Sequence, residues 1–253
     1  MDFLALHEPS LNSPGESVPF PDMHGKVVIM TALPSDLKLL GKVFGFDLEA
    51  KKQLFCARVL TAAPQFPNLV VCGGFMGAPL AAMLLEVLAA KGARDFLFCG
   101  PCGSLDPVTD IGAIFLAEAA FANDGTVKHY AAAPCSAPHP EYHRVMKAIL
   151  NTRQQRFARG LIASTDGMFR ETLSLVNYFK HNNCRAVDME TAALFAVAKY
   201  LNVKMCSINV ISDVFCNETW LNGIGSGDFK RGRAEAIKII KEMVVWMQKA
   251  ILI

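Results

Sequence analysis

The stretch "CRAVDMETAALFAVAKYLNV", residues 184–203, carries two acids at the start of a segment that otherwise looks buried. From Thr191 onward the residues are apolar and rich in alanine, which is typical of a helix packed into a core. Asp188 and Glu190 flank Met189 at its start. Carboxylates are favourable near a helix N-terminus, so capping is the simplest interpretation of both acids. An ionised carboxylate also accepts hydrogen bonds from two adjacent hydroxyls, which makes Glu190 a candidate sugar ligand beside the apolar Met189.

Strand-like apolar runs and helical patterns alternate on both sides of this stretch. The strand-like runs include "KVVIMTAL" (26–33), "NLVVCGGF" (68–75), "DFLFCG" (95–100) and "KMCSINVISD" (204–213), and helices are expected near residues 34–45, 79–92 and 231–253. Strands that alternate with helices predict an α/β fold, a three-layer αβα domain around a mixed, largely parallel sheet. We expect residues 25–253 to form this single domain and residues 1–24, rich in Pro, Ser and acids, to form an N-terminal arm.

Composition excludes several classes of protein. The 253 residues are 52% apolar and 19% charged with a net charge of +2, which suits a compact protein and gives no argument for nucleic acid or membrane-surface binding. No apolar run is long enough to span a membrane, and no secretory segment is recognisable, so a cytoplasmic protein is expected. The eight cysteines lack the spacing of a zinc site, so we expect buried free thiols and no metal.

Four loops follow the predicted strands, at the edge where parallel sheets bind ligands. They are residues 34–36, 73–77, 100–103 and 212–215. The glycines in "GGFMG" and "GPCG" either bring backbone amides close to a ligand or form ordinary turns, and neither motif is that of a dinucleotide or P-loop site. Asp213 is expected at the end of an apolar strand, where partial burial would raise its pKa and suit it to donate a proton. A cap for the following turn is the alternative.

Two further loops carry candidate ligand-binding side chains. In "STDGMFRET" (164–172), Met168 and Phe169 lie among small polar residues, and an aromatic ring there would stack on a planar base or pack in the core. Trp220 follows in a glycine-rich segment that would be able to close over a site.

Taken in order and at these distances, the motifs resemble the nucleoside phosphorylase/nucleosidase superfamily. This group includes purine nucleoside phosphorylases, uridine phosphorylases and methylthioadenosine/adenosylhomocysteine nucleosidases. The resemblance rests on "CGPCGSL" (99–105), "VDMETAALFAVAKYLNV" (187–203) and "VISDV" (210–214), and extends from Lys26 to the C-terminal helix. It implies cleavage of an N-glycosidic bond through an oxocarbenium-like state, without cofactor or metal, in a homo-oligomer, either a dimer or a hexamer.

The resemblance also implies roles for individual residues. Glu190 would bind the ribose 2′ and 3′ hydroxyls, and Asp213 would protonate or hydrogen-bond N7 of a purine leaving group. Pyrimidine-specific members lack an acid at the position of Asp213, so a purine nucleoside is the expected substrate. The other residues expected along the sugar or the base are Met189, Cys102, Gly103, Met168 and Phe169.

Departures from the family pattern bear on the attacking group, which is water or phosphate. The phosphate-binding arginines and hydroxyl of the phosphorylases are replaced at Asp36, Phe98 and Pro101, and a phosphate dianion beside Asp36 would be repelled. Nucleosidases carry a water-activating glutamate at the position of Asp36, so the resemblance favours hydrolysis with Asp36 as the base. A phosphorylase that uses other cations and an inactive nucleoside-binding homologue remain the alternatives. Asn209 replaces an arginine of the nucleosidase water site, and Phe75 replaces a glycine near the sugar.

Overall fold

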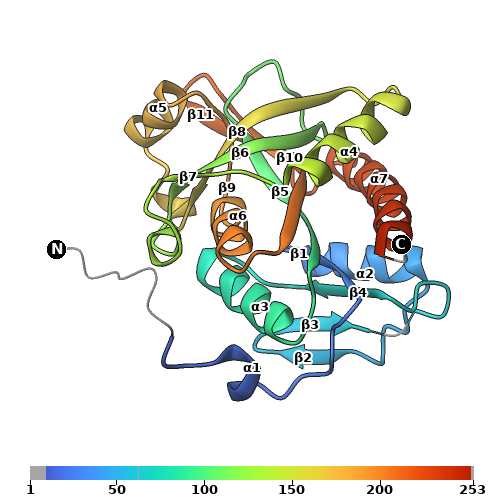
Figure 1. Ribbon diagram of the computed structural model, residues 1–253. Coiled ribbons are helices and arrows are strands. Elements are labelled where there is room, and N and C mark those ends of the chain that lie inside the picture. The colour runs from blue at the N-terminus through green and yellow to red at the C-terminus, as the bar shows by residue number, and fades with distance from the viewer. Residues whose placement is uncertain (1–9, 62, 252–253) are drawn as a thin grey trace.

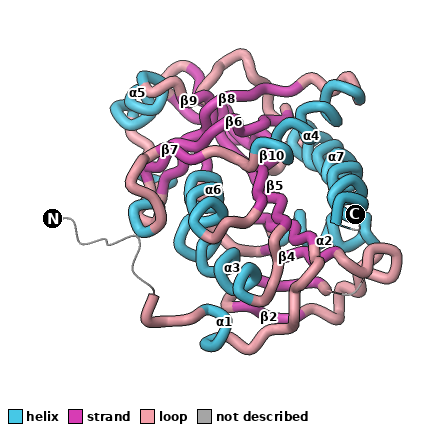
Figure 2. The backbone as a smooth tube through the Cα atoms, in the orientation of Figure 1, coloured by secondary structure: helices cyan, strands magenta, loops and turns pink. Residues whose placement is uncertain are grey.

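The computed structural model describes residues 10–61 and 63–251, with a mixed sheet between two groups of helices (Figures 1 and 2). The strands are β1 (Val27–Thr31), β2 (Lys52–Leu54), β3 (Ala57–Leu60), β4 (Leu69–Gly73), β5 (Asp95–Ser104), β6 (Ile114–Asn123), β7 (Cys135–Ser136), β8 (Phe157–Thr165), β9 (Cys184–Asp188), β10 (Lys204–Cys216) and β11 (Thr219–Asn222). The helices are α1 (Pro14–Ser17), α2 (Pro34–Phe44), α3 (Ala78–Ala90), α4 (Pro140–Thr152), α5 (Leu173–His181), α6 (Thr191–Tyr200) and α7 (Gly227–Ile251).

Two large apolar cores lie on opposite faces of the sheet. One lies against α3 and α6 and contains Phe96 and Phe195, and the other lies against α2, α4 and α7 and contains Leu40 and Ile240. Figure 1 shows α3 and α6 on one side and α2, α4 and α7 on the other. The predicted α/β architecture with helices on both faces is therefore confirmed.

β5 is the strand that pairs with both β9 and β10 at the site described below. It pairs in parallel with β1 along residues 95–99 and with β10 along its whole length. Its last two residues, Gly103 and Ser104, pair antiparallel with Val187 and Ala186 of β9. The ends of β5, β9 and β10 therefore meet, and the strand order is β11-β10-β6-β8-β9-β5-β1-β4-β3-β2, with β7 beside β6.

β5 and β10 are both longer than the sequence predicts, because they continue to pair with each other. Residues 100–103 and 212–215, expected as loops, are strand residues. β10 then turns into β11 through Asn217 and Glu218, whose φ angles of 49° and 60° suit a tight hairpin turn. Trp220 therefore belongs to a strand and not to a loop, and its ring centroid lies 5.5 Å from that of Phe215.

Helix boundaries follow local signals more closely. Pro34 starts α2 and Gly45 ends it in the left-handed conformation with φ 74°, as predicted from proline and glycine at these positions. In the described part of the expected arm, Lys91 Nζ of the chain segment after α3 donates to the Gly15 carbonyl at 2.6 Å, and Met23 is buried. α1 and Met23 therefore pack against α3 and the segment after it in the same chain, whereas residues 1–9 of the arm lie outside the described residues.

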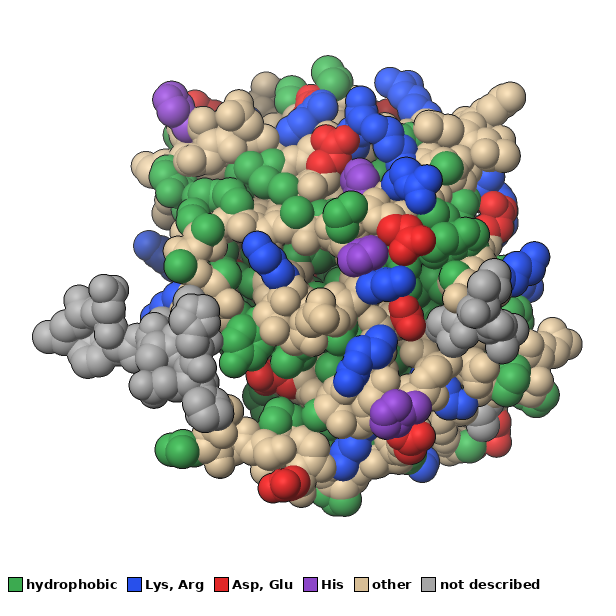
Figure 3. Space-filling view, viewed as in Figure 1, with side chains coloured by type: hydrophobic (Ala, Val, Ile, Leu, Met, Phe, Trp, Pro, Cys, Tyr) green, Lys and Arg blue, Asp and Glu red, His purple; other side chains and the backbone are tan. Residues whose placement is uncertain are grey.

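Positive and negative side chains are interspersed on the face shown in Figure 3, in keeping with the small net charge. Among the described helices, none combines the length and the apolar character that crossing a membrane requires.

Candidate functional site

A cavity of about 490 Å³ opens where the ends of β5, β9 and β10 meet the loops that lead into α2 and α3. Its size is typical of small-molecule sites. Most of its wall is apolar and includes Leu33, Phe75, Met76 and Ile224. Phe75 belongs to this wall and lies close to Phe98, with ring centroids 6.3 Å apart.

The two acids of the 184–203 stretch have different partners. Asp188 accepts hydrogen bonds at the start of α6 from the Thr191 amide at 3.1 Å and from the Thr191 hydroxyl, and another from Ser164 Oγ at 2.6 Å. Glu190 occupies the N-cap position of α6, but its side chain does not cap the helix. Its Oε1 instead accepts from the Gly77 amide at 2.7 Å, across the cavity wall. Asp188 therefore caps α6, whereas the Glu190 side chain lines the cavity.

Burial makes ionisation of both acids costly. Burial and then the charge of Asp188 raise the pKa of Glu190, against the Gly77 hydrogen bond. Burial also raises the pKa of Asp188, and the hydrogen bonds from Ser164 and Thr191 oppose that rise. Perturbed acids of this kind in a cavity are typical of functional sites.

Asp213 lies at an irregularity of β10 that presents it to the same cavity. The register against β5 shifts between Ile211 and Asp213, so that both Ser212 and Asp213 line the cavity. Ser212 Oγ lies 2.5 Å from Asp213 Oδ1 and 3.2 Å from the Cys102 carbonyl oxygen. Burial raises the pKa of Asp213, against the hydrogen bond from Ser212.

Gly103 leaves the space that Asp213 and Trp220 fill. A Cβ atom at Gly103 would lie 2.8 Å from Asp213 Oδ2 and 2.7 Å from the Trp220 ring, too close for either neighbour. Gly103 therefore lines the cavity because only glycine allows the carboxylate to pack there. This close approach gives the glycine of "GPCG" a specific function in the site.

Five of the predicted site residues come together around the cavity, and they are Asp213, Glu190, Met189, Gly103 and Met168. Three of the others do not line it. Phe169 is 91% exposed, beyond the cavity wall. The Cys102 side chain is buried in the core against α3 and α6. Its carbonyl oxygen alone contacts a cavity residue, by accepting a hydrogen bond from Ser212 Oγ. Asn209 is fully buried in β10, and its amide atoms have no hydrogen-bond partner within the described residues.

Asp36 does not line the cavity either, which corrects its expected position beside the attacking group. Its carboxylate forms an ion pair with Arg233 of α7, whose Nη2 also donates to Ser35 Oγ at 2.9 Å. Burial raises the pKa of Asp36, against the charge of Arg233. Leu33 and Pro34 line the cavity, whereas Asp36 in the first turn of α2 points to Arg233 of α7.

Glu171 lines the cavity although no motif had pointed to it. Burial and then the charge of Asp213 raise the pKa of Glu171 to about 7. The acids of the described lining are thus Glu171, Asp188, Glu190 and Asp213, and no Lys, Arg or His is among these lining residues. The loop 164–172 was singled out for its aromatic residue, and its acids, Asp166 and Glu171, are the signal that could have drawn attention to Glu171.

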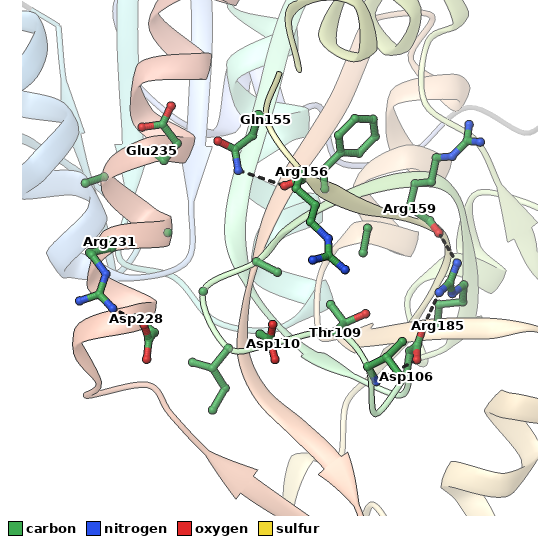
Figure 4. Close-up of a pocket in the computed structure, with 18 of the residues that line it drawn as sticks. Asp106, Thr109, Asp110, Gln155, Arg156, Arg159, Arg185, Asp228, Arg231 and Glu235 are labelled. Carbon is green, nitrogen blue, oxygen red and sulfur yellow. Dashed lines mark hydrogen bonds and ion pairs between the residues drawn. The ribbon is translucent and has the colours of Figure 1, made fainter. Parts of the chain in front are cut away.

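A second, broader hollow of about 910 Å³ lies between the loop after β5, the start of β8 and α7 (Figure 4). Its wall carries both signs of charge, and Figure 4 shows Arg185 next to Asp106 and Arg231 next to Asp228. None of the predicted site residues lines this charged groove.

The amino-acid sequence itself is similar to that of a known protein family. A family model described as "Phosphorylase superfamily" matches residues 26–244. The chain belongs to the phosphorylase superfamily. Two relatives within it are similar to this chain over different spans. A guanosine phosphorylase of Halorubrum lacusprofundi is 28% identical over 144 residues, which cover 56% of this chain and only 59% of that relative. A uridine phosphorylase of Thermococcus kodakarensis is 25% identical over 240 residues, which cover 88% of this chain and 84% of that relative.

Solved structures of the superfamily fold extend the comparison to a hydrolase. A mutant of the futalosine hydrolase of Helicobacter pylori superposes with a TM-score of 0.72 at 18% identity, covering 87% of this chain and 98% of that one. At this identity the likeness shows the fold and leaves the reaction open.

Proposed function

We propose that this phosphorylase superfamily member cleaves the N-glycosidic bond of a purine nucleoside by hydrolysis. The observation that carries the proposal is a buried carboxyl, Glu190, and a partly buried one, Asp213, that face one apolar cavity. Neither forms an ion pair within the described residues. Acids without a compensating cation are costly to bury, and sites of catalysis are where such cost is tolerated.

The two carboxyls have separate functions in the proposed reaction. Asp213 donates a proton, or a hydrogen bond, to N7 of the purine, so that the base leaves without accumulating negative charge. Its raised pKa keeps the proton available nearer to neutral pH than an exposed aspartate would. Glu190 accepts hydrogen bonds from the ribose hydroxyls through the oxygen that Gly77 leaves free.

The electrostatics of the cavity favour water as the attacking group. The oxocarbenium-like state carries positive charge, which the acidic wall stabilises, whereas a phosphate dianion would approach the same acids. Asp36 pairs with Arg233 and does not line the cavity, so the proposal does not use it to activate water. Phosphorolysis is the second candidate, because the matched relatives are named as phosphorylases. It would require cations from outside the described lining.

The reaction is tested by incubation with guanosine, inosine, adenosine and methylthioadenosine, each with and without phosphate. Free ribose, or methylthioribose, released at the same rate in both buffers supports hydrolysis. Ribose 1-phosphate formed only with phosphate identifies a phosphorylase instead. Binding of these nucleosides without release of a base contradicts both, and indicates an inactive homologue.

A homo-oligomer and a cytoplasmic location remain part of the proposal. Met76 and Ile224 belong to the cavity wall and are 63% and 47% exposed, an apolar surface that a second copy would cover. Light scattering on the purified protein separates monomer, dimer and hexamer.

A further inference from the structure

The charged groove has a floor that backbone contacts hold in place. Gly112 and Gly232 let the loop after β5 lie directly on α7, since a Cβ atom at Gly232 would overlap the Gly112 carbonyl oxygen. The Gly112 amide donates to the Ile211 carbonyl at 2.8 Å, and the Ile211 amide donates to the Ala113 carbonyl at 2.9 Å. The floor is therefore fixed to both α7 and β10, and the hollow of about 910 Å³ above it keeps its shape without a ligand.

Most charged side chains of the groove are already paired. The ion pairs are those of Arg185 with Asp106, Arg231 with Asp228, Lys238 with Glu235, and Arg159 with Glu118, which lies outside the lining. Each pair is neutral as a whole, so these side chains give the groove no strong preference for a ligand of either sign.

Two lining residues of opposite charge have no such partner. Arg156 directly precedes β8, and Asp110 belongs to the loop after β5. The Arg156 carbonyl accepts from Gln155 at 3.0 Å, and the Asp110 carbonyl accepts from the Ala113 amide at 3.1 Å. Neither charged group forms a hydrogen bond or an ion pair with another described residue, and the two do not pair with each other. Figure 4 shows Arg156 reaching into the middle of the hollow, above Asp110.

Apolar side chains accompany these two charges in the wall of the groove. Phe157 follows Arg156 and Ile111 follows Asp110, and both apolar side chains are partly buried. Val108 of the same wall is 76% exposed. The free binding groups of the groove are thus a cation, an anion and an apolar surface, in a space of the size that small molecules occupy.

A simple anion fits this set of groups less well than a zwitterion does. A phosphate dianion would gain Arg156 but would be repelled by Asp110 and by the acids of the neighbouring ion pairs. A zwitterion adds no net charge. Its carboxylate can accept two parallel hydrogen bonds from a guanidinium, and its ammonium can donate to a carboxylate.

We propose that the charged groove binds a small zwitterion with an apolar side chain, either a free α-amino acid or a dipeptide. Its carboxylate pairs with Arg156, its ammonium pairs with Asp110, and its side chain lies on the apolar wall. No residue that lines the cavity also lines the groove, so this inference does not depend on the proposed cleavage reaction.

An NMR titration of the isotope-labelled full-length protein with leucine and with leucyl-leucine tests the inference and separates the two ligand classes. With the ligand that binds, amide signals of residues 108–112 and 155–159 should shift, and those of Gly77 and Gly103 in the cavity should not. N-acetylation or amidation of that ligand removes one charged end, which should weaken binding about 10-fold, as for a lost hydrogen bond to a charged group.

Three results of this titration would overturn the inference. The first is that neither leucine nor leucyl-leucine shifts the signals of the groove. The second is equal affinity for the free and the N-acetylated ligand, which would indicate a site for carboxylates alone. The third is tighter binding of inorganic phosphate than of either zwitterion.

Arg156→Gln and Asp110→Asn assign the two contacts. Both side chains are exposed and unpaired among the described residues, so both variants should fold. Arg156→Gln should remove the preference for the free ligand over its amide, and Asp110→Asn should remove the preference over the N-acetylated form. Each variant should also lower the affinity for the free ligand about 10-fold. Preferences that survive both substitutions contradict the assignment.

Arg231→Gln is the matched control. Arg231 lines the same groove and carries the same charge as Arg156, but it is paired with Asp228. The variant should bind the zwitterion within a few-fold of the wild-type affinity. A loss as large as that in Arg156→Gln would show that the net charge of the groove, and not a contact with Arg156, governs binding.

Discussion

The cavity and the charged groove are both hollows lined with acids, and they differ in how those acids are balanced. The cavity is about half the volume of the groove, 490 against 910 Å³, and has an apolar wall with acids that lack cations among the described lining residues. In the groove Asp106 and Asp228 face Arg185 and Arg231. Volume and the number of charged residues would thus favour the groove as the functional site, whereas acids without a paired cation favour the cavity.

Asp36 and Asp213 show the same difference within one residue type. Both are buried or partly buried aspartates whose pKa is raised by burial. Arg233 neutralises Asp36, whereas Asp213 has only the Ser212 hydroxyl. A compensated acid stabilises the fold, and an uncompensated one is available for chemistry. The following predictions test this contrast.

Asp213→Asn should have the largest effect. Asparagine fills the same space but has no carboxyl proton to donate, so kcat should fall by about 10²- to 10⁴-fold. Steady-state kinetics on the best nucleoside measures the loss, and nucleoside binding should change only a few-fold. Wild-type turnover in this variant would mean that Asp213 is not the acid.

Asp36→Asn should affect stability rather than turnover. The change leaves Arg233 largely buried without its counter-charge, which should lower the free energy of unfolding by about 3 kcal/mol. Urea denaturation measures this difference. The folded variant should retain kcat within a few-fold. A stable variant with a large loss of kcat would instead return Asp36 to the reaction, as the sequence first predicted.

Glu190→Gln should damage activity and stabilise the protein. The folded state raises the pKa of Glu190 above its usual value, so the protein loses stability as the pH rises from the usual pKa of a glutamate towards the folded pKa, and the loss levels off above it. Glutamine retains an acceptor for Gly77 and removes the buried charge, which should add about 1 kcal/mol to the free energy of unfolding at pH 8. Below the usual pKa of a glutamate, where both states are protonated, this gain should vanish. Urea denaturation at about pH 3.5 and about pH 8, on either side of this range, tests the sign.

Arg185→Gln in the charged groove should have the smallest effect. The side chain is 49% exposed, and its pair with Asp106 is of the kind that contributes less than about 1 kcal/mol. Turnover should not change, and the small loss of stability should shrink in high salt. A loss of turnover comparable to that of Asp213→Asn would show that the groove takes part in the reaction.

The sequence predicted the parts of the fold and site that depend on neighbouring residues. Pro34 and Gly45 mark the ends of α2, and the Asp-Met-Glu start of α6 lies at the cavity. Partners distant in sequence could not be foreseen. Arg233 is separated from Asp36 by 197 positions, and nothing local to α2 indicates that pair. The extension of β10 depends on its pairing with β5 and β11.

Side-chain direction in a loop was also beyond the sequence. Phe169 had the chemistry of a stacking residue, yet it is exposed, and Glu171 turns inward two positions later. The 3₁₀ turn before Glu171 and the cap after it decide between these orientations. Composition of the loop alone contains no information on which side faces the cavity.

The division between Asp188 and Glu190 has a consequence for redesign of the protein. Asp188 holds the first turn of α6, so the helix does not depend on the identity of its neighbour two positions on. If residue 190 contacts the sugar as proposed, an engineer can vary it to accept altered sugars while Asp188 keeps the start of the helix in place. The same freedom is open to natural variation, since a substitution there exchanges one ligand preference for another without dismantling the helix that presents it.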